Sequence, residues 1–169
     1  MKPLSSTILS KSEIVCSLPL QMVLYFNSLY SPFWIITHVC TLVLKFQILS
    51  ITYKVIIVAI HAVAVAVEIV RIYLGFVGNL LEKIPELAGF WIATLVLQLP
   101  ITTFLLFHSG LQLLPLEQVA DTIHLLFVIG ECTIGFMTLR KIARHQVTKF
   151  QQQVLSQLEE ENEKQNKLE

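Results

Sequence analysis

The sequence is short of charge. Only 14% of its 169 residues are Asp, Glu, Lys or Arg, whereas a soluble globular domain carries about 25%. Hydrophobic residues make up 54% of the chain, and its mean hydropathy is +0.69. Too little polar surface is left to coat a water-soluble core, so most apolar side chains are expected to face lipid or other membrane helices. The 12 basic and 12 acidic residues cancel, which argues against nucleic acid as the main ligand.

Cysteine pairs, glycosylation sequons and catalytic motifs are also lacking. Cys16, Cys40 and Cys132 show neither a CxxC pair nor a metal-ligand spacing, so no disulfide framework is expected. No asparagine has Ser or Thr two residues later. The chain contains no nucleophile elbow, HExxH motif or phosphate-binding loop. These absences predict a protein that is not an enzyme and holds no cofactor or metal.

Two long runs contain no charge at all. One extends over the 31 residues from Ile14 to Leu44, and the other over the 30 residues from Leu87 to Leu116. A helix rises about 1.5 Å per residue and needs about 20 residues to cross the hydrocarbon core. Each run therefore predicts one membrane helix, over residues 20–44 and 87–107. Pro32 lies inside the first run, where membrane helices tolerate a proline as a kink, and Pro100 lies in the middle of the second run.

Two further apolar segments contain ionisable residues. Residues 55–77 include Glu68 and Arg71, and residues 118–139 include Glu131. With the two charge-free runs, these segments predict an all-α membrane protein with four transmembrane helices in two hairpins. Between the second and third helices, glycines and an asparagine at residues 75–79 predict a turn.

The ends of the chain are polar. Residues 1–17 form a short head without a recognisable fold, and residues 18–139 hold the four membrane helices. Residues 140–169 form a tail that is first basic and then acidic, in which apolar residues recur at helical spacing. This spacing predicts a helical extension in the cytosol, and a short coiled-coil or partner-binding helix is the alternative.

The positions of the charges predict the orientation. Seven Lys and Arg residues lie on the side that holds both ends, namely Lys2, Lys11, Lys83, Arg140, Lys141, Arg144 and Lys149. The opposite side has only Lys45 and Lys54 near the membrane. Because cytosolic loops carry the excess of Lys and Arg, both termini are expected in the cytosol.

The ionisable residues within the second and fourth segments are candidates for function. Glu68 and Arg71 are three residues apart and share a helical face, and an unpaired charge at mid-helix costs about 2.5–3.5 kcal/mol. His61 lies two turns before Glu68, and His124 and Glu131 repeat that spacing. The pattern predicts a polar seam that joins helices. The alternatives are a proton relay or ion path in a small transporter or channel subunit, and a metal site whose geometry nothing fixes.

The stretch from Glu68 to Trp91, EIVRIYLGFVGNLLEKIPELAGFW, closely resembles the transmembrane protein 17 family of ciliary transition-zone membrane proteins. The resemblance continues in LQMVLYFNSLY (20–30), LQLPITTFLLF (97–107), LPLE (114–117) and TLRKI (138–142). It covers about residues 18–150, so nothing is carried over to the head or to the glutamate-rich tail.

This resemblance implies a non-enzymatic, four-span component of the tectonic-like (Meckel) complex at the ciliary transition zone. The complex is thought to act in the membrane diffusion barrier, ciliogenesis and Sonic hedgehog signalling. The expected partners are the lipid bilayer and other membrane and soluble members of that complex, with no nucleic acid and no small-molecule substrate. The resemblance also emphasises the cytosolic turn from Arg71 to Glu86, where Lys83 and Glu86 predict a docking surface.

Overall fold

A computed structural model describes residues 16–47, 50–107 and 114–166, so most of the predicted head lies outside the described residues. Within these ranges the chain is helical, with short turns between helices. The elements are α1 (Leu18–Lys45), α2 (Ile51–Leu80), α3 (Ile84–Ile92), the π-helix η1 (Ala93–Gln98), α4 (Leu99–Phe107) and α5 (Pro115–Asn166).

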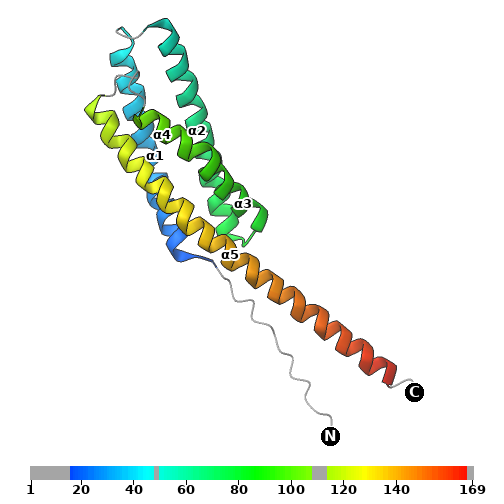
Figure 1. The fold of residues 1–169 in the computed structure, drawn as a ribbon. Helices are drawn as coiled ribbons and strands as arrows, with labels where there is room; N and C mark the ends of the chain where they lie inside the picture. The colour runs from blue at the N-terminus through cyan, green and yellow to red at the C-terminus, as the bar shows by residue number, and fades with distance from the viewer. Residues whose placement is uncertain (1–15, 48–49, 108–113, 167–169) are drawn as a thin grey trace.

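Four helical rods form a bundle, because α3, η1 and α4 follow one another without a break (Figure 1). The rod α3–η1–α4 packs against α2 and α5, and α1 packs against the same two helices. The two hairpins are therefore closed into one ring by the contact between α1 and α5. The predicted fold class, an all-α membrane protein with a helical C-terminal extension, is confirmed.

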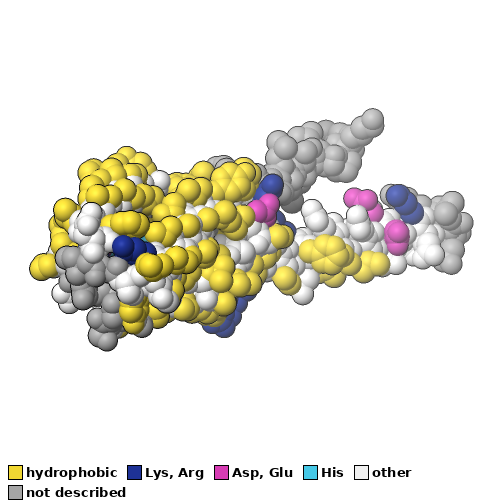
Figure 2. Space-filling model, turned by 90° about the horizontal axis from the view of Figure 1, so that it is seen from above, with side chains coloured by type: hydrophobic (Ala, Val, Ile, Leu, Met, Phe, Trp, Pro, Cys, Tyr) yellow, Lys and Arg dark blue, Asp and Glu magenta, His cyan; other side chains and the backbone are white. Residues whose placement is uncertain are grey.

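Three of the rods are long and apolar enough to cross a bilayer, namely Ile51–Leu80, Ile84–Phe107 and Pro115–Asn166. With 28 residues, α1 is similar in length to α2 and to the rod α3–η1–α4, but it carries buried polar side chains, including Asn27, His38 and Thr41. These polar groups lower the hydropathy of α1. The crossing of the membrane by α1 stays a prediction from the sequence. In the view of Figure 2, hydrophobic side chains cover most of the visible face of the bundle.

The predicted turn after the second helix is misplaced. Gly75 and Gly78 lie inside α2, which continues to Leu80, and the chain turns at Leu81 and Glu82 instead. Glu82 has a φ of 52°, in the left-handed region. The glycines serve close packing: a Cβ added at Gly78 would lie 2.6 Å from the backbone nitrogen of Leu87 in α3. The absence of a side chain thus lets α2 and α3 approach each other.

The third rod contains six residues of π-helix, Ala93–Gln98, just before Pro100. Pro100 has no N–H to donate to the carbonyl of Val96, and its ring would clash with that carbonyl in an α-helix. A π-helical turn is one way in which a membrane helix accommodates such a proline. The helix is therefore locally wider just before this proline.

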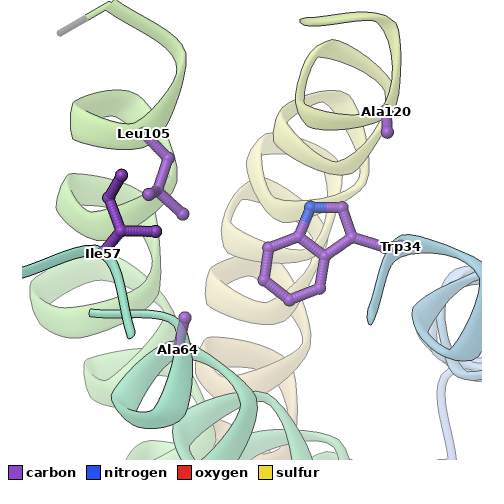
Figure 3. Close-up of a cluster of buried hydrophobic side chains, with 5 residues drawn as sticks. All are labelled: Trp34, Ile57, Ala64, Leu105 and Ala120. Atoms are coloured by element: carbon purple, nitrogen blue, oxygen red, sulfur yellow. The ribbon is translucent and has the colours of Figure 1, made fainter. Parts of the chain in front are cut away.

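Two hydrophobic clusters hold the bundle together, one in each half. The first consists of Trp34, Ile57, Ala64, Leu105 and Ala120. Figure 3 shows the Trp34 indole projecting from α1 into the space between the helices. The second consists of Leu20, Leu24, Leu87, Phe90 and Ile142. Buried polar side chains lie along the same interior faces.

Candidate functional site: a buried polar seam

The centre of the seam is an ion triad between α2 and α5. Arg71 Nε donates to Glu68 Oε2 at 2.7 Å, and Arg71 Nη1 donates to Glu131 Oε2. All three side chains are fully buried. α2 places Glu68 and Arg71 one turn apart on the same face, and α5 supplies the second carboxylate. Because a buried charge is costly unless it is paired and hydrogen-bonded, each member of the triad depends on the others.

α1 contacts the carboxylate of Glu68 directly, and the rod α3–η1–α4 is connected to it through His124 of α5. From α1, Asn27 Nδ2 and Ser31 Oγ each donate to Glu68 Oε1 at 2.9 Å. His124 of α5 lies with its Nε2 3.5 Å from Glu68 Oε2, and Gln98 of η1 lies 3.1 Å from the same histidine nitrogen. Glu68 therefore stands where polar groups from the bundle's helices converge.

A second polar group centres on Asp121 of α5. Its Oδ1 accepts a hydrogen bond from Trp34 Nε1 at 2.9 Å, and His38 Nε2 lies 2.8 Å from it. The Trp34 indole also stacks on His124, with ring centroids 4.6 Å apart, and so connects this group to the triad. Asp121 was not predicted as a site residue, yet it joins α5 to α1 as Glu131 joins α5 to α2.

His61 belongs to this second group. Its Nε2 lies 2.7 Å from His38 Nδ1, and its Nδ1 lies 2.8 Å from the carbonyl oxygen of Ile57. The contacts from Ile57 through His61 and His38 to Asp121 therefore form a continuous row that joins α2 to α1 and α1 to α5.

An ion pair closes the seam at one end of the bundle. Lys45, the last residue of α1, donates to Glu117 in the first turn of α5. The carboxylate also accepts bonds from the Thr41 hydroxyl and, at 3.1 Å, from the backbone N–H of Leu114. Lys45 is thus buried rather than extended into the membrane interface.

Asn79 near the end of α2 anchors the other end. Its Oδ1 accepts from the backbone N–H of Ser17 at 3.0 Å, and its Nδ2 donates to the Ser17 carbonyl at 3.0 Å and to Gln21 Oε1 at 2.9 Å. The start of α1 is thereby held against the end of α2.

The structure brings some predicted site residues together and leaves others apart. Glu68, Arg71 and Glu131 meet in the triad. Lys83 and Glu86 lie outside the seam and face each other at the start of α3, with Nζ and Oε1 3.5 Å apart and side chains 51% and 28% exposed. Among the described residues, no group of three or more His, Cys, Asp or Glu side chains could hold a metal ion.

Sequence reasoning missed the contribution of α1. Its buried side chains are Leu20, Leu24, Asn27, Ser31, Trp34, His38, Thr41 and Lys45. The steps between them alternate strictly between four and three residues, which is the spacing of a helix packed in a left-handed bundle. That spacing was a usable signal, because six of the eight residues, from Asn27 to Lys45, are polar, charged or able to form a hydrogen bond.

The comparisons with known proteins agree with a membrane protein. A family model described as "predicted membrane protein" matches residues 22–128. The chain is similar to transmembrane protein 17 of Gallus gallus, with 46% identity over 149 residues, which cover 88% of this chain and 72% of the relative. It is 44% identical over 148 residues to transmembrane protein 17 of Homo sapiens, covering 88% and 75%. It is 46% identical over 138 residues to transmembrane protein 17B of Danio rerio, covering 82% and 72%. No solved structure matches the chain.

Proposed function

The chain belongs to the transmembrane protein 17 family, and from this premise we propose that it is a non-enzymatic membrane scaffold. In this proposal it is a component of the tectonic-like complex at the ciliary transition zone. There it acts in the membrane diffusion barrier and is required for ciliogenesis and Sonic hedgehog signalling. Its partners are the bilayer and the other members of that complex.

One observation supports a scaffold above all. The intramembrane ionisable groups bond to one another across helices, as in the bonds of Arg71 to Glu68 and to Glu131. Side chains used in this way hold a bundle together. A transporter or channel subunit, the other function considered from the sequence, would use His61, Glu68, Arg71 and Glu131 to carry an ion, which their mutual bonding supports less well.

The proposed orientation places the Asn79 end of the bundle in the cytosol. Lys83 and the basic start of the extension of α5 lie at this end, and Arg140, Lys141 and Arg144 are exposed there. Each basic side chain near an anionic leaflet contributes about 1 kcal/mol of attraction. The same end carries the docking surface proposed below.

The location is tested with a tagged copy of the full chain in ciliated cells. We expect a focus at the base of the cilium, and shortened or missing cilia when the gene is removed. Diffuse staining of the plasma membrane without such a focus would contradict the proposal and favour the transporter alternative.

We propose that the turn after α2 docks other members of the complex through Lys83 and Glu86. Replacing both with alanine is expected to reduce co-purification of the complex several-fold while the bundle stays folded. An exposed ion pair of this kind contributes only about 0–1 kcal/mol to folding. Lys54→Ala is the matched control, because Lys54 lies near the start of α2, at the other end of that helix. Unchanged co-purification of the double variant would contradict the proposed docking surface.

A further inference from the structure

The C-terminal part of α5 extends beyond the bundle. Gln146 Nε2 donates to the carbonyl oxygen of Glu82 in the turn after α2, at 2.7 Å, and nearly all described residues of α5 beyond this bond are exposed. Beyond it, α5 continues as one helix to Asn166, over a length of about 30 Å at the usual rise per residue. Figure 1 shows this segment running straight away from the other helices.

One face of this segment is an exposed apolar stripe. Val147, Phe150, Val154 and Leu158 recur at steps of three and four residues, and each is between 37% and 65% exposed. Such spacing places their side chains on the same face of a helix. Ser156 lies on the opposite face. Hydrophobic side chains are visible on the extension in Figure 2.

The stripe is not positioned to lie on the membrane surface. The segment is continuous with the part of α5 that crosses the bundle, so it points away from the bilayer. Sharp bends in helices arise at prolines, at glycines or at π-bulges, and residues 147–166 contain no proline or glycine. A second helix is therefore the natural cover for the stripe.

The charges beside the stripe disfavour a second copy of this chain as that helix. Arg140 and Arg144 lie at its membrane end, and Glu159 and Glu161 lie at its far end. Two copies in one membrane would run parallel, so that arginine would meet arginine and glutamate would meet glutamate. Like charges facing each other across an interface disfavour that pairing, as flanking charges do in coiled coils.

We propose that residues 147–158 of α5 bind a helix of a different protein. That helix carries an apolar stripe of its own, acidic side chains at the end next to the membrane and basic side chains at the far end. The inference rests on the proposed scaffold function and gives it one specific contact, separate from the turn that contains Lys83.

The test is photo-crosslinking in ciliated cells with the full chain. A photoreactive residue replaces Phe150 on the stripe or, as the matched control, Ser156 on the opposite face. We expect an adduct from position 150 and none from position 156. Sequencing the crosslinked peptide should reveal a helical segment with the stated order of acidic, apolar and basic residues.

Two variants test separately how charge and apolar contact contribute to the binding of the second helix. Exchanging the charges in Arg140→Glu, Arg144→Glu, Glu159→Lys and Glu161→Lys keeps the net charge and should lower the adduct yield about tenfold. Phe150→Ser with Leu158→Ser keeps the charges, and it should abolish an adduct formed from position 154. Membrane levels of both variants should match the unmodified chain.

Several outcomes would overturn the inference: an adduct with twice the mass of the chain, adducts with lipid alone, no adduct, or a yield unchanged by the charge exchange. Its failure differs from that of the proposed function. A focus at the ciliary base without the adduct refutes only the helix contact. The adduct without such a focus refutes only the ciliary role.

Discussion

Replacing Arg71 with methionine is expected to lower the free energy of unfolding by about 3–5 kcal/mol, because the substitution leaves two buried carboxylates without their cation. Arg71 contacts both Glu68 and Glu131, and all three side chains are fully buried. Methionine is shorter than arginine but fills a similar volume, so the loss reflects charge more than volume. The measurement is thermal or denaturant unfolding of the purified chain in detergent, followed by tryptophan fluorescence.

The triple variant Arg71→Met, Glu68→Gln and Glu131→Gln is the informative comparison. It removes the two carboxylates together with the cation, and replacing a whole buried ion group is often nearly neutral. We expect it to regain most of the lost stability. Lys83→Ala serves as the control for an exposed ion pair, with an effect of about 0–1 kcal/mol. If Arg71→Met unfolds no more easily than Lys83→Ala, the triad does not hold α2 to α5.

Gly78→Ala is expected to destabilise the bundle by about 1–3 kcal/mol, the usual effect of overpacking. The new Cβ would lie 2.6 Å from the nitrogen and 2.8 Å from the Cα of Leu87. Both are backbone atoms, so α3 would have to move away from α2. The same unfolding assay in detergent measures the effect.

Gly130→Ala is the matched control and should have the opposite sign. Apart from the two adjacent residues and the nearby backbone of α5 itself, no atom lies within 4 Å of a Cβ added at Gly130, inside α5. Alanine in a helix interior is more stable than glycine by about 0.5–1 kcal/mol. Equal effects of the two substitutions would mean that the contact between α2 and α3 is looser than described.

The helices and their main ion pair were predictable from the sequence because both depend on local spacing. The bounds of the predicted spans at 20–44 and 87–107 lie within three residues of the bounds of α1 and of the described rod from α3 to α4. The pairing of Glu68 with Arg71 follows from a separation of three residues. The spans follow from the hydropathy of each segment, and the ion pair follows from the spacing of one helical turn. Neither prediction needs knowledge of how the helices contact one another.

Contacts between helices were less predictable. The bond from Asn27 to Glu68 joins residues 41 apart, and that from Trp34 to Asp121 joins residues 87 apart. The sequence marked the first segment only as a charge-free membrane helix, since Asn, Ser, Trp, His and Thr carry no fixed charge. The polar face of this helix is visible in the sequence only as polar residues that are separated alternately by four and three positions.

The glycines of α2 illustrate a second limit. Glycine is common both in turns and where two helices pack closely, so composition alone does not separate the two roles. The turn prediction was wrong because Gly75 and Gly78 lie on the buried face of α2, with Phe90 and Leu87 of α3 against them. A spacing of three residues from Gly75 to Gly78 continues the buried stripe that includes Glu68 and Arg71.

The positions of the buried polar side chains also restrict how far one helix can shift along another. If α2 moved by one turn against α5, Arg71 would leave Glu131 and approach apolar or uncharged neighbours such as Val128 or Gly135. Each stranded charge would then cost about 2.5–3.5 kcal/mol in the middle of the membrane. A purely apolar bundle has no such penalty and can settle in several alignments. In the observed alignment each buried charge of the described residues has a partner, so the turn after α2 and the long extension of α5 are held at fixed positions relative to the other helices.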